Sequence, residues 1–190
     1  TQRAVEEGPV ADRRREGGQP DLCVLDGDRR IWIEAITPSE GITGPDRIVR
    51  PIPINQGGGL VAAPIRQAQL RISSAFLTKA RAIGRYIEQG LIAPDDTRII
   101  AISGGRFGVY VSDQPLPLAI TMLFPIGDAY VTIDRATGAI VDEGFHSAPF
   151  IRRNGGPIPR TAFLDERFAD VSGVIWSRVG IGNDSRQARP

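Results

Sequence analysis

Residues 20–36 read PDLCVLDGDRRIWIEAI, in which two apolar runs flank the turn signal DGD at 26–28. An Asp-Gly pair between apolar runs is typical of a tight β-turn, so we expect an antiparallel hairpin with strands over 21–25 and 29–37. The second run is apolar on both faces except at Glu34, which predicts a central strand covered from both sides. Glu34 is therefore expected to be a buried carboxylate.

A long helix and a further strand are predicted after the hairpin. Residues 64–89 form the longest predicted helix, because the stretch starts at a proline and stops before Gly90. Residues 98–103 read RIIAIS and predict a short buried strand that ends at a glycine pair. Between hairpin and helix, the proline- and glycine-rich residues 38–59 predict a long irregular connection. A hairpin, a helix and a strand in this order indicate an α/β fold.

The chain has the size and composition of one globular domain. It has 190 residues, of which 41% are hydrophobic and 24% are charged. We expect a single domain over 1–190 with a core over about 20–104, a C-terminal extension over 105–178 and a tail over 179–190. Outside the core, we expect a short frayed helix in 1–19, a helix over 115–124, a hairpin of 129–133 with 139–142, a helical turn over 163–169 and a last strand over 171–178.

Membrane and disulfide-stabilised classes are excluded by simple counts. The longest apolar stretch, residues 116–126, is too short for a bilayer and contains two prolines. Cys23 is the only cysteine and no signal peptide opens the chain, so we expect a reducing, cytoplasmic compartment. The chain begins with Thr1 instead of methionine, which leaves a trimmed N-terminus as an open alternative.

The charge is nearly balanced overall but unevenly distributed. The formal net charge is +1, which does not by itself indicate a nucleic-acid-binding protein. Residues 1–40 carry six basic and nine acidic side chains, whereas residues 41–110 carry nine basic and four acidic ones. This pattern suits a phosphate-binding groove beside a carboxylate cluster, although blocks of this size are also ordinary on solvated surfaces.

Lys79 is the only lysine among 23 basic residues. It falls on the apolar stripe of the long helix, close to Ile72, Phe76 and Ile83, and so points toward the predicted sheet. Because a buried ammonium needs a partner, we expect Lys79 to pair with Glu34.

Asp21 adds a second carboxylate beside Glu34, at the start of the strand that pairs with the one carrying Glu34. Two carboxylates on adjacent strands and one ammonium would form an oxygen-rich site for a divalent cation, with a positive charge to steer a phosphate or orient water. A structural ion pair of Lys79 with Glu34, or a lysine that reaches past the helix edge to solvent, is the alternative.

The sequence resembles the PD-(D/E)XK nuclease superfamily. The resemblance lies in Pro20-Asp21, which is followed by twelve intervening residues and then by Glu34-Ala35-Ile36. The resemblance implies a restriction-endonuclease-like mixed sheet flanked by helices, here with an extra β-hairpin and a strand after the core. In that superfamily the two acids bind magnesium, and a backbone carbonyl next to the second acid helps. Asp21 and Glu34 would then be catalytic metal ligands, with Ala35 offering its carbonyl.

The sequence departs from the superfamily motif at its third position. Ile36 stands where the motif has a lysine that orients the attacking water. Some members move this lysine to the following helix, so Lys79 would be the third catalytic residue. An additional acid from a first helix is common in the superfamily, and Glu7 is the candidate for this further metal ligand.

The resemblance implies a metal-dependent endonuclease with Mg²⁺ as cofactor and Mn²⁺ as its substitute. The implied partner is a nucleic acid, DNA in preference to RNA, with no membrane and with a homodimer as an open alternative. The competing hypothesis is a non-catalytic nucleic-acid or protein binding module on the same scaffold, which Ile36 favours.

The one histidine and a pair of arginines near the C-terminus are further candidate functional residues. His146 is the only histidine, which excludes two-histidine zinc sites, and a hydrolase that uses His146 with Ser147 and Asp142 is a third, more distant alternative. A histidine in a loop is the simpler interpretation. Arg152 and Arg153 could hold phosphates, but an exposed strand end explains them equally well.

Overall fold

The structure is a computed structural model, which describes the following parts of the chain: residues 5–6, 18–41, 47–49, 63–107, 115–152 and 156–178. It contains a five-stranded sheet with the strand order β1-β2-β3-β4-β9. The strands are β1 (Val5–Glu6), β2 (Leu22–Asp26), β3 (Arg29–Ile36), β4 (Thr97–Ser103) and β9 (Gly173–Ser177). β1, β2 and β3 pair antiparallel, whereas β3, β4 and β9 pair parallel, so the sheet is mixed.

The predicted hairpin forms β2 and β3. Gly27, in the turn between them, has a φ of 63°, a conformation that glycine adopts without steric cost. The register pairs Leu22 with Ile33 and Asp26 with Arg29. This register fixes which residues before β2 lie beside the end of β3.

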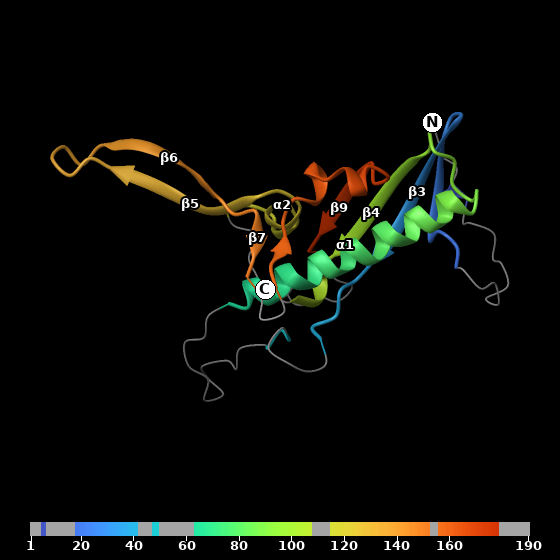
Figure 1. Ribbon diagram of the computed structural model, residues 1–190, viewed down its shortest axis with the longest axis horizontal. Coiled ribbons are helices and arrows are strands. Elements are labelled where there is room, and N and C mark those ends of the chain that lie inside the picture. The colour runs from blue at the N-terminus through green and yellow to red at the C-terminus, as the bar shows by residue number, and fades with distance from the viewer. Residues whose placement is uncertain are drawn as a thin grey trace, which may run out of the picture. The chain divides into compact units, whose positions relative to one another are not determined.

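The long helix is α1 (Ile65–Glu88), whose C-terminal half lies beside the sheet (Figure 1). It begins directly after Pro64 and stops before Gly90, which has a φ of 70°. The predicted apolar stripe is buried, since Ile72, Phe76 and Ile83 are all at most 1% exposed. The C-terminal half of α1 packs against β3 through a core cluster of Ala82, Tyr86 and Ile92 with Trp32 and Ile87.

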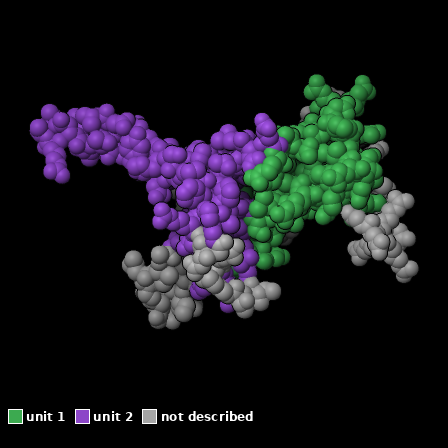
Figure 2. All heavy atoms as spheres, viewed as in Figure 1, with its two compact units in different colours: residues 1–40, 74–108, 167–190 green, residues 41–73, 109–166 purple. Residues whose placement is uncertain are grey.

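The chain divides into two compact units that alternate along the sequence (Figure 2). Unit 1 comprises residues 1–40, 74–108 and 167–190, and unit 2 comprises 41–73 and 109–166. Unit 1 contains the five-stranded sheet, and the boundary falls within α1. The single domain over 1–190 stays a prediction.

Unit 2 contains shorter elements. They are α2 (Leu118–Leu123), β5 (Ile126–Ile133), β6 (Ile140–Ser147), β7 (Phe150–Ile151), β8 (Ile158–Pro159) and the 3₁₀ turn η3 (Ala162–Leu164). β5 and β6 form the second predicted hairpin, which is longer than the sequence indicated. β7 and β8 form a small antiparallel pair that the sequence did not predict.

The α/β class with a mixed sheet is confirmed, and so are the long helix, both hairpins and the last strand, within a few residues. The predicted helix over 115–124 is shorter, because it begins only after Pro117. The turn over 163–169 consists of η3 and η4 (Glu166–Phe168), both 3₁₀. No helix in the described part of the chain is long and apolar enough to cross a membrane.

Two expectations about the five-stranded sheet are wrong. Val5 and Glu6 form a strand that pairs with β2, instead of belonging to a frayed helix, because pairing with an open strand edge outweighs weak local helix preference. β3 is not fully covered on both faces: Glu34 is buried, but Ile33 is half-buried and Ala35 exposed on the opposite face. The apolar character of both faces therefore overstated the burial of this strand.

Candidate catalytic cluster

Asp21 lies directly before β2, where the hairpin register places it beside the end of β3. Its amide donates a hydrogen bond to Glu34 Oε1 over 3.1 Å. In return, the Ala35 amide donates to Asp21 Oδ2 over 2.8 Å. These reciprocal bonds hold the two carboxylates next to each other, as the sequence predicted.

Glu34 occupies the face of β3 that packs against α1. It lies two residues after Trp32, and residues at this spacing share one face of a strand. Trp32 packs against the α1 cluster described above, and Glu34 is only 2% exposed. The predicted buried carboxylate is therefore present.

Lys79 joins both carboxylates. Its Nζ lies 2.6 Å from Glu34 Oε2 and 2.9 Å from Asp21 Oδ2. The Lys79 side chain is 17% exposed, compared with 3% for Glu34 and 45% for Asp21. The only lysine thus lies at a common point with the two acids, which we call the Asp21–Glu34–Lys79 cluster.

Burial and charge act differently on the members of this cluster. Burial raises the pKa of Glu34, and the hydrogen bond and charge of Lys79 offset this only in part. Burial alone would lower the pKa of Lys79, but its hydrogen bonds and charge interactions with Glu34 and Asp21 outweigh burial, so the pKa of Lys79 is raised. Lys79 is consequently held as an ammonium, and the Glu34 carboxyl takes up a proton at a higher pH than an ordinary glutamate does.

Tyr86, which the sequence pattern did not single out, also belongs to this region. Its hydroxyl donates a hydrogen bond over 3.1 Å to the carbonyl of Gln19, two residues before Asp21. Burial and the negative charge of Glu34 raise the pKa of the Tyr86 hydroxyl. Tyr86 follows Lys79 by seven positions, which is about two helical turns, and this spacing was the signal available in the sequence. We regard Tyr86 as a residue that positions the segment leading to Asp21.

One carboxylate oxygen of the cluster is open to a further ligand such as the predicted magnesium ion. Within the described residues, Asp21 Oδ1 receives no hydrogen bond, whereas both oxygens of Glu34 are occupied. No group of three or more His, Cys, Asp or Glu in the described ranges could hold a metal ion. Mg²⁺ often binds one or two carboxylates and completes its shell with water and substrate phosphates. The magnesium site at the two acids stays a prediction.

The other predicted ligands have different outcomes. Glu7 lies outside the described residues. Ala35 contributes its amide to Asp21, and the metal-binding role of its carbonyl stays a prediction.

The residues of the alternative hydrolase lie in unit 2. His146 belongs to strand β6, so its placement in a loop is wrong. The Tyr130 ring lies 4.8 Å from the His146 ring, and the Tyr130 hydroxyl donates a hydrogen bond over 3.1 Å to Asp142. The described contacts of His146 and Asp142 are thus made with Tyr130, which gives no support to a Ser147-centred triad.

Comparison with known proteins gives no family for this chain: no protein-family model matches it, and neither the curated proteins nor the solved structures contain a match.

Proposed function

We propose that this protein is a metal-dependent nucleic-acid phosphodiesterase of the PD-(D/E)XK type, with a restriction-endonuclease-like core. The observation that carries the proposal is the position of Lys79, which donates hydrogen bonds to both acids of the motif-like sequence. All other residues among the 23 lysines and arginines of the chain are arginines, and the one lysine lies at this point. The protein would act in the cytoplasm, on DNA in preference to RNA.

Each member of the cluster has a distinct part in this proposal. Asp21 and Glu34 would hold Mg²⁺, with Asp21 Oδ1 as the most accessible oxygen. The bound ion would polarise the scissile phosphate and stabilise the charge that develops during hydrolysis. The carbonyl of Ala35 is the candidate third oxygen.

Lys79 would orient the attacking water. Its ammonium has three protons, and within the described residues two of them are used by Glu34 and Asp21. The third is left for a water molecule or a phosphate oxygen. As an ammonium paired with two carboxylates, Lys79 would act as a hydrogen-bond donor and a positive charge.

Cleavage assays test this proposal directly. Purified protein is incubated with single-stranded DNA, duplex DNA and RNA in Mg²⁺, in Mn²⁺ and in EDTA. We expect cleavage that requires the metal and is lost in both Asp21→Asn and Lys79→Met. Asp28→Asn, an exposed acid in the neighbouring turn, and Arg85→Met, an exposed base on α1, are the matched controls and should retain activity.

Circular dichroism of each variant separates loss of activity from loss of fold. Folded wild-type protein that is inert on all three substrates with either metal would refute the nuclease proposal.

A binding module on the same scaffold is the second candidate. It is favoured by Ile36 in the third motif position and by the occupation of both Glu34 oxygens. In that case Lys79→Met would retain nucleic-acid binding and lose stability, and calorimetric titration with Mg²⁺ would give no heat that depends on Asp21.

A further inference from the structure

Unit 2 contains a cleft with a volume of about 860 Å³, which the proposed chemistry does not use. Its wall combines Arg66, Arg152 and Arg160 with Phe145 and Phe150. We call it the arginine–phenylalanine cleft. Volumes of about 300–1,000 Å³ are typical of sites for small molecules or for single groups of a larger ligand.

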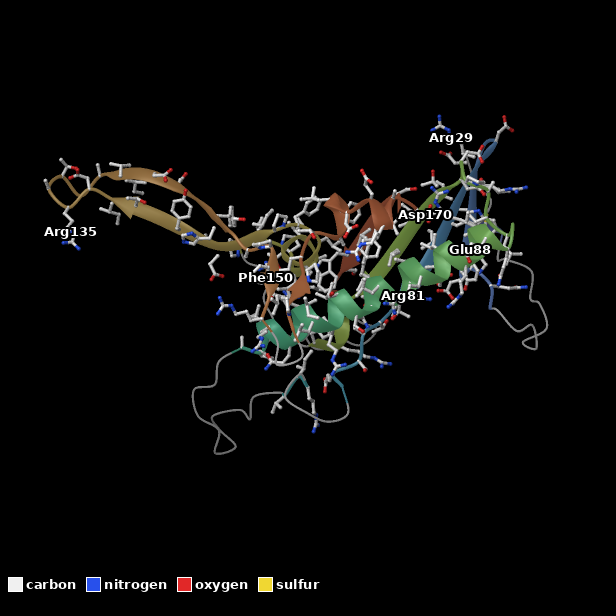
Figure 3. The ribbon with its side chains drawn as sticks, in the orientation of Figure 1. Arg29, Arg81, Glu88, Arg135, Phe150 and Asp170 are labelled. Carbon is white, nitrogen blue, oxygen red and sulfur yellow. The ribbon has the colours of Figure 1, made fainter. Side chains whose placement is uncertain are left out.

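The arginines give the cleft an excess of positive charge. Among the described residues of the wall, Asp128 is the one acidic residue, against three guanidinium groups. A second cleft, in unit 1, shows the contrast: its three arginines, Arg81, Arg85 and Arg167, share a wall with Glu88 and Asp170. Figure 3 labels Arg81, Glu88 and Asp170 in that unit. The cleft in unit 2 is therefore the better site for an anion.

Backbone carbonyls hold two of the three guanidinium groups of this wall, those of Arg160 and Arg66. Arg160 is 7% exposed, and its guanidinium donates hydrogen bonds to the backbone carbonyls of Thr121 and Ile126. The Arg66 guanidinium donates to the backbone carbonyl of Arg152, while both side chains lie at the surface. A preorganised guanidinium group is well suited to bind phosphate, because less side-chain entropy is lost on binding.

Phe145 and Phe150 supply flat apolar surface beside these charges. They are 44% and 48% exposed, although large aromatic side chains are usually well buried. Arginines next to exposed aromatic rings are typical of proteins that bind single-stranded nucleic acid. The phosphates of the strand pair with the arginine side chains, and its nucleobases stack on the aromatic rings. In a duplex the faces of the nucleobases are covered by their neighbours, so stacking on protein rings requires an unpaired strand.

We propose that the arginine–phenylalanine cleft binds single-stranded nucleic acid, with phosphates on Arg66 and Arg152 and a nucleobase on Phe150. This inference rests on the proposed function, because it names the form of substrate that the protein would hold. Arg160, which is bound to backbone carbonyls, would shape the cleft and add positive charge. The proposed ligand is a strand, and not a free nucleotide, because the cleft combines two exposed arginines with two exposed phenylalanine rings, and a strand offers several phosphates and nucleobases to them.

Fluorescence anisotropy in EDTA tests this inference without cleavage. Labelled 12-nucleotide single-stranded DNA, the same sequence as RNA, and duplex DNA are titrated with wild-type protein at several salt concentrations. We expect either single strand to bind more tightly than the duplex. Phe150→Ala should weaken single-strand binding about tenfold, and Arg152→Gln should reduce the slope of log affinity against log salt by about 1.

Two exposed residues of unit 2 outside the cleft provide matched controls. Arg135→Gln, at the tip of the β5–β6 hairpin (Figure 3), and Leu164→Ala, which removes a side chain that is 63% exposed, should leave binding unchanged. Competition with dAMP shows whether the cleft recognises a free nucleotide or a nucleotide within a strand. We expect dAMP to compete only weakly with the labelled oligonucleotide. If dAMP bound as tightly as the oligonucleotide, the inference of a strand-binding cleft would be overturned.

The outcomes separate this inference from the proposed nuclease activity. Equal binding of duplex and single strand, or equal effects of Arg152→Gln and Arg135→Gln, would overturn the inference even if the protein cleaves DNA. Single-strand binding that depends on Phe150 in a protein without metal-dependent cleavage would support the cleft and refute the nuclease.

Discussion

The sheet of unit 1 and the β5–β6 hairpin of unit 2 use carboxylates in opposite ways. In unit 1, burial raises the pKa of Glu34, whose partner Lys79 is 45 positions away in the chain. In the hairpin, Asp134 is exposed to water and accepts hydrogen bonds from Ala136 and Thr137, two and three positions away. These hydrogen bonds lower the pKa of Asp134. The same chemical group thus depends on tertiary packing in one region and on a local turn in the other.

This contrast indicates where sequence changes should act globally and where they should act locally. A carboxylate that is buried with a distant ammonium links the stability of the whole unit to the presence of both partners. A carboxylate that caps its own turn stabilises a few residues and contributes little to the rest.

The largest effect is expected for Lys79→Met. It removes the partner of a carboxylate that is 2% exposed, and an unpaired buried charge is costly, so we expect a loss of about 3 kcal/mol in the free energy of unfolding. Urea denaturation measures this loss. The double variant Lys79→Met with Glu34→Leu should recover most of it, because two apolar side chains replace the ion pair. A double variant that is less stable than the single one would contradict this account.

The raised pKa of Glu34 predicts a specific dependence of stability on pH. The unfolded carboxyl ionises near its ordinary pKa of 4.5, while the folded one ionises at higher pH. The contribution of Glu34 is therefore complete below pH 4.5 and is lost as the pH rises through the folded pKa, by at most about 1.4 kcal/mol per pH unit.

Comparison with Glu34→Gln isolates this contribution. The free energy of unfolding of the wild type minus that of Glu34→Gln should fall as pH rises above 4.5 and then become constant. A difference that rises with pH over this range would show that Glu34 has a lowered pKa instead.

The same contrast explains what the sequence could predict. Glu34 and Lys79 were found because two simple periodicities, strand alternation and helical spacing, place them on facing surfaces. The strand at Val5–Glu6 escaped prediction, since a pairing of two residues leaves no periodic signal. Of the residues of the arginine–phenylalanine cleft used in the proposal, only Arg152 was recognised in the sequence as a possible phosphate ligand, because the wall is assembled from residues as distant as Arg66 and Arg160. Arrangements made by loops over long separations have no counterpart in local sequence pattern.

Tyr86→Phe is expected to have an intermediate effect. The change removes the hydroxyl that donates to the Gln19 carbonyl and keeps the ring in its apolar cluster, so we expect a loss of about 1 kcal/mol in urea denaturation. Arg85→Met, on the exposed side of the same helix turn, should have no measurable effect. A loss as large as that of Lys79→Met would mean that the Tyr86 hydroxyl holds the cluster together, and no loss would mean that it does not position Gln19.

The smallest effect on global stability is expected at Asp134. Because its pKa is lowered, its contribution is present above the ordinary value of 3.8 and is lost as the pH falls through the folded pKa. The amide proton shifts of Ala136 and Thr137, which donate to Asp134 Oδ1, should therefore titrate with a midpoint below 3.8. Asp134→Ala should abolish this titration and speed hydrogen exchange at the hairpin tip, with an unchanged Tm. A fall in Tm similar to that of Lys79→Met would show that the hairpin turn is coupled to the rest of the protein, and that the distinction between a local and a buried carboxylate does not hold here.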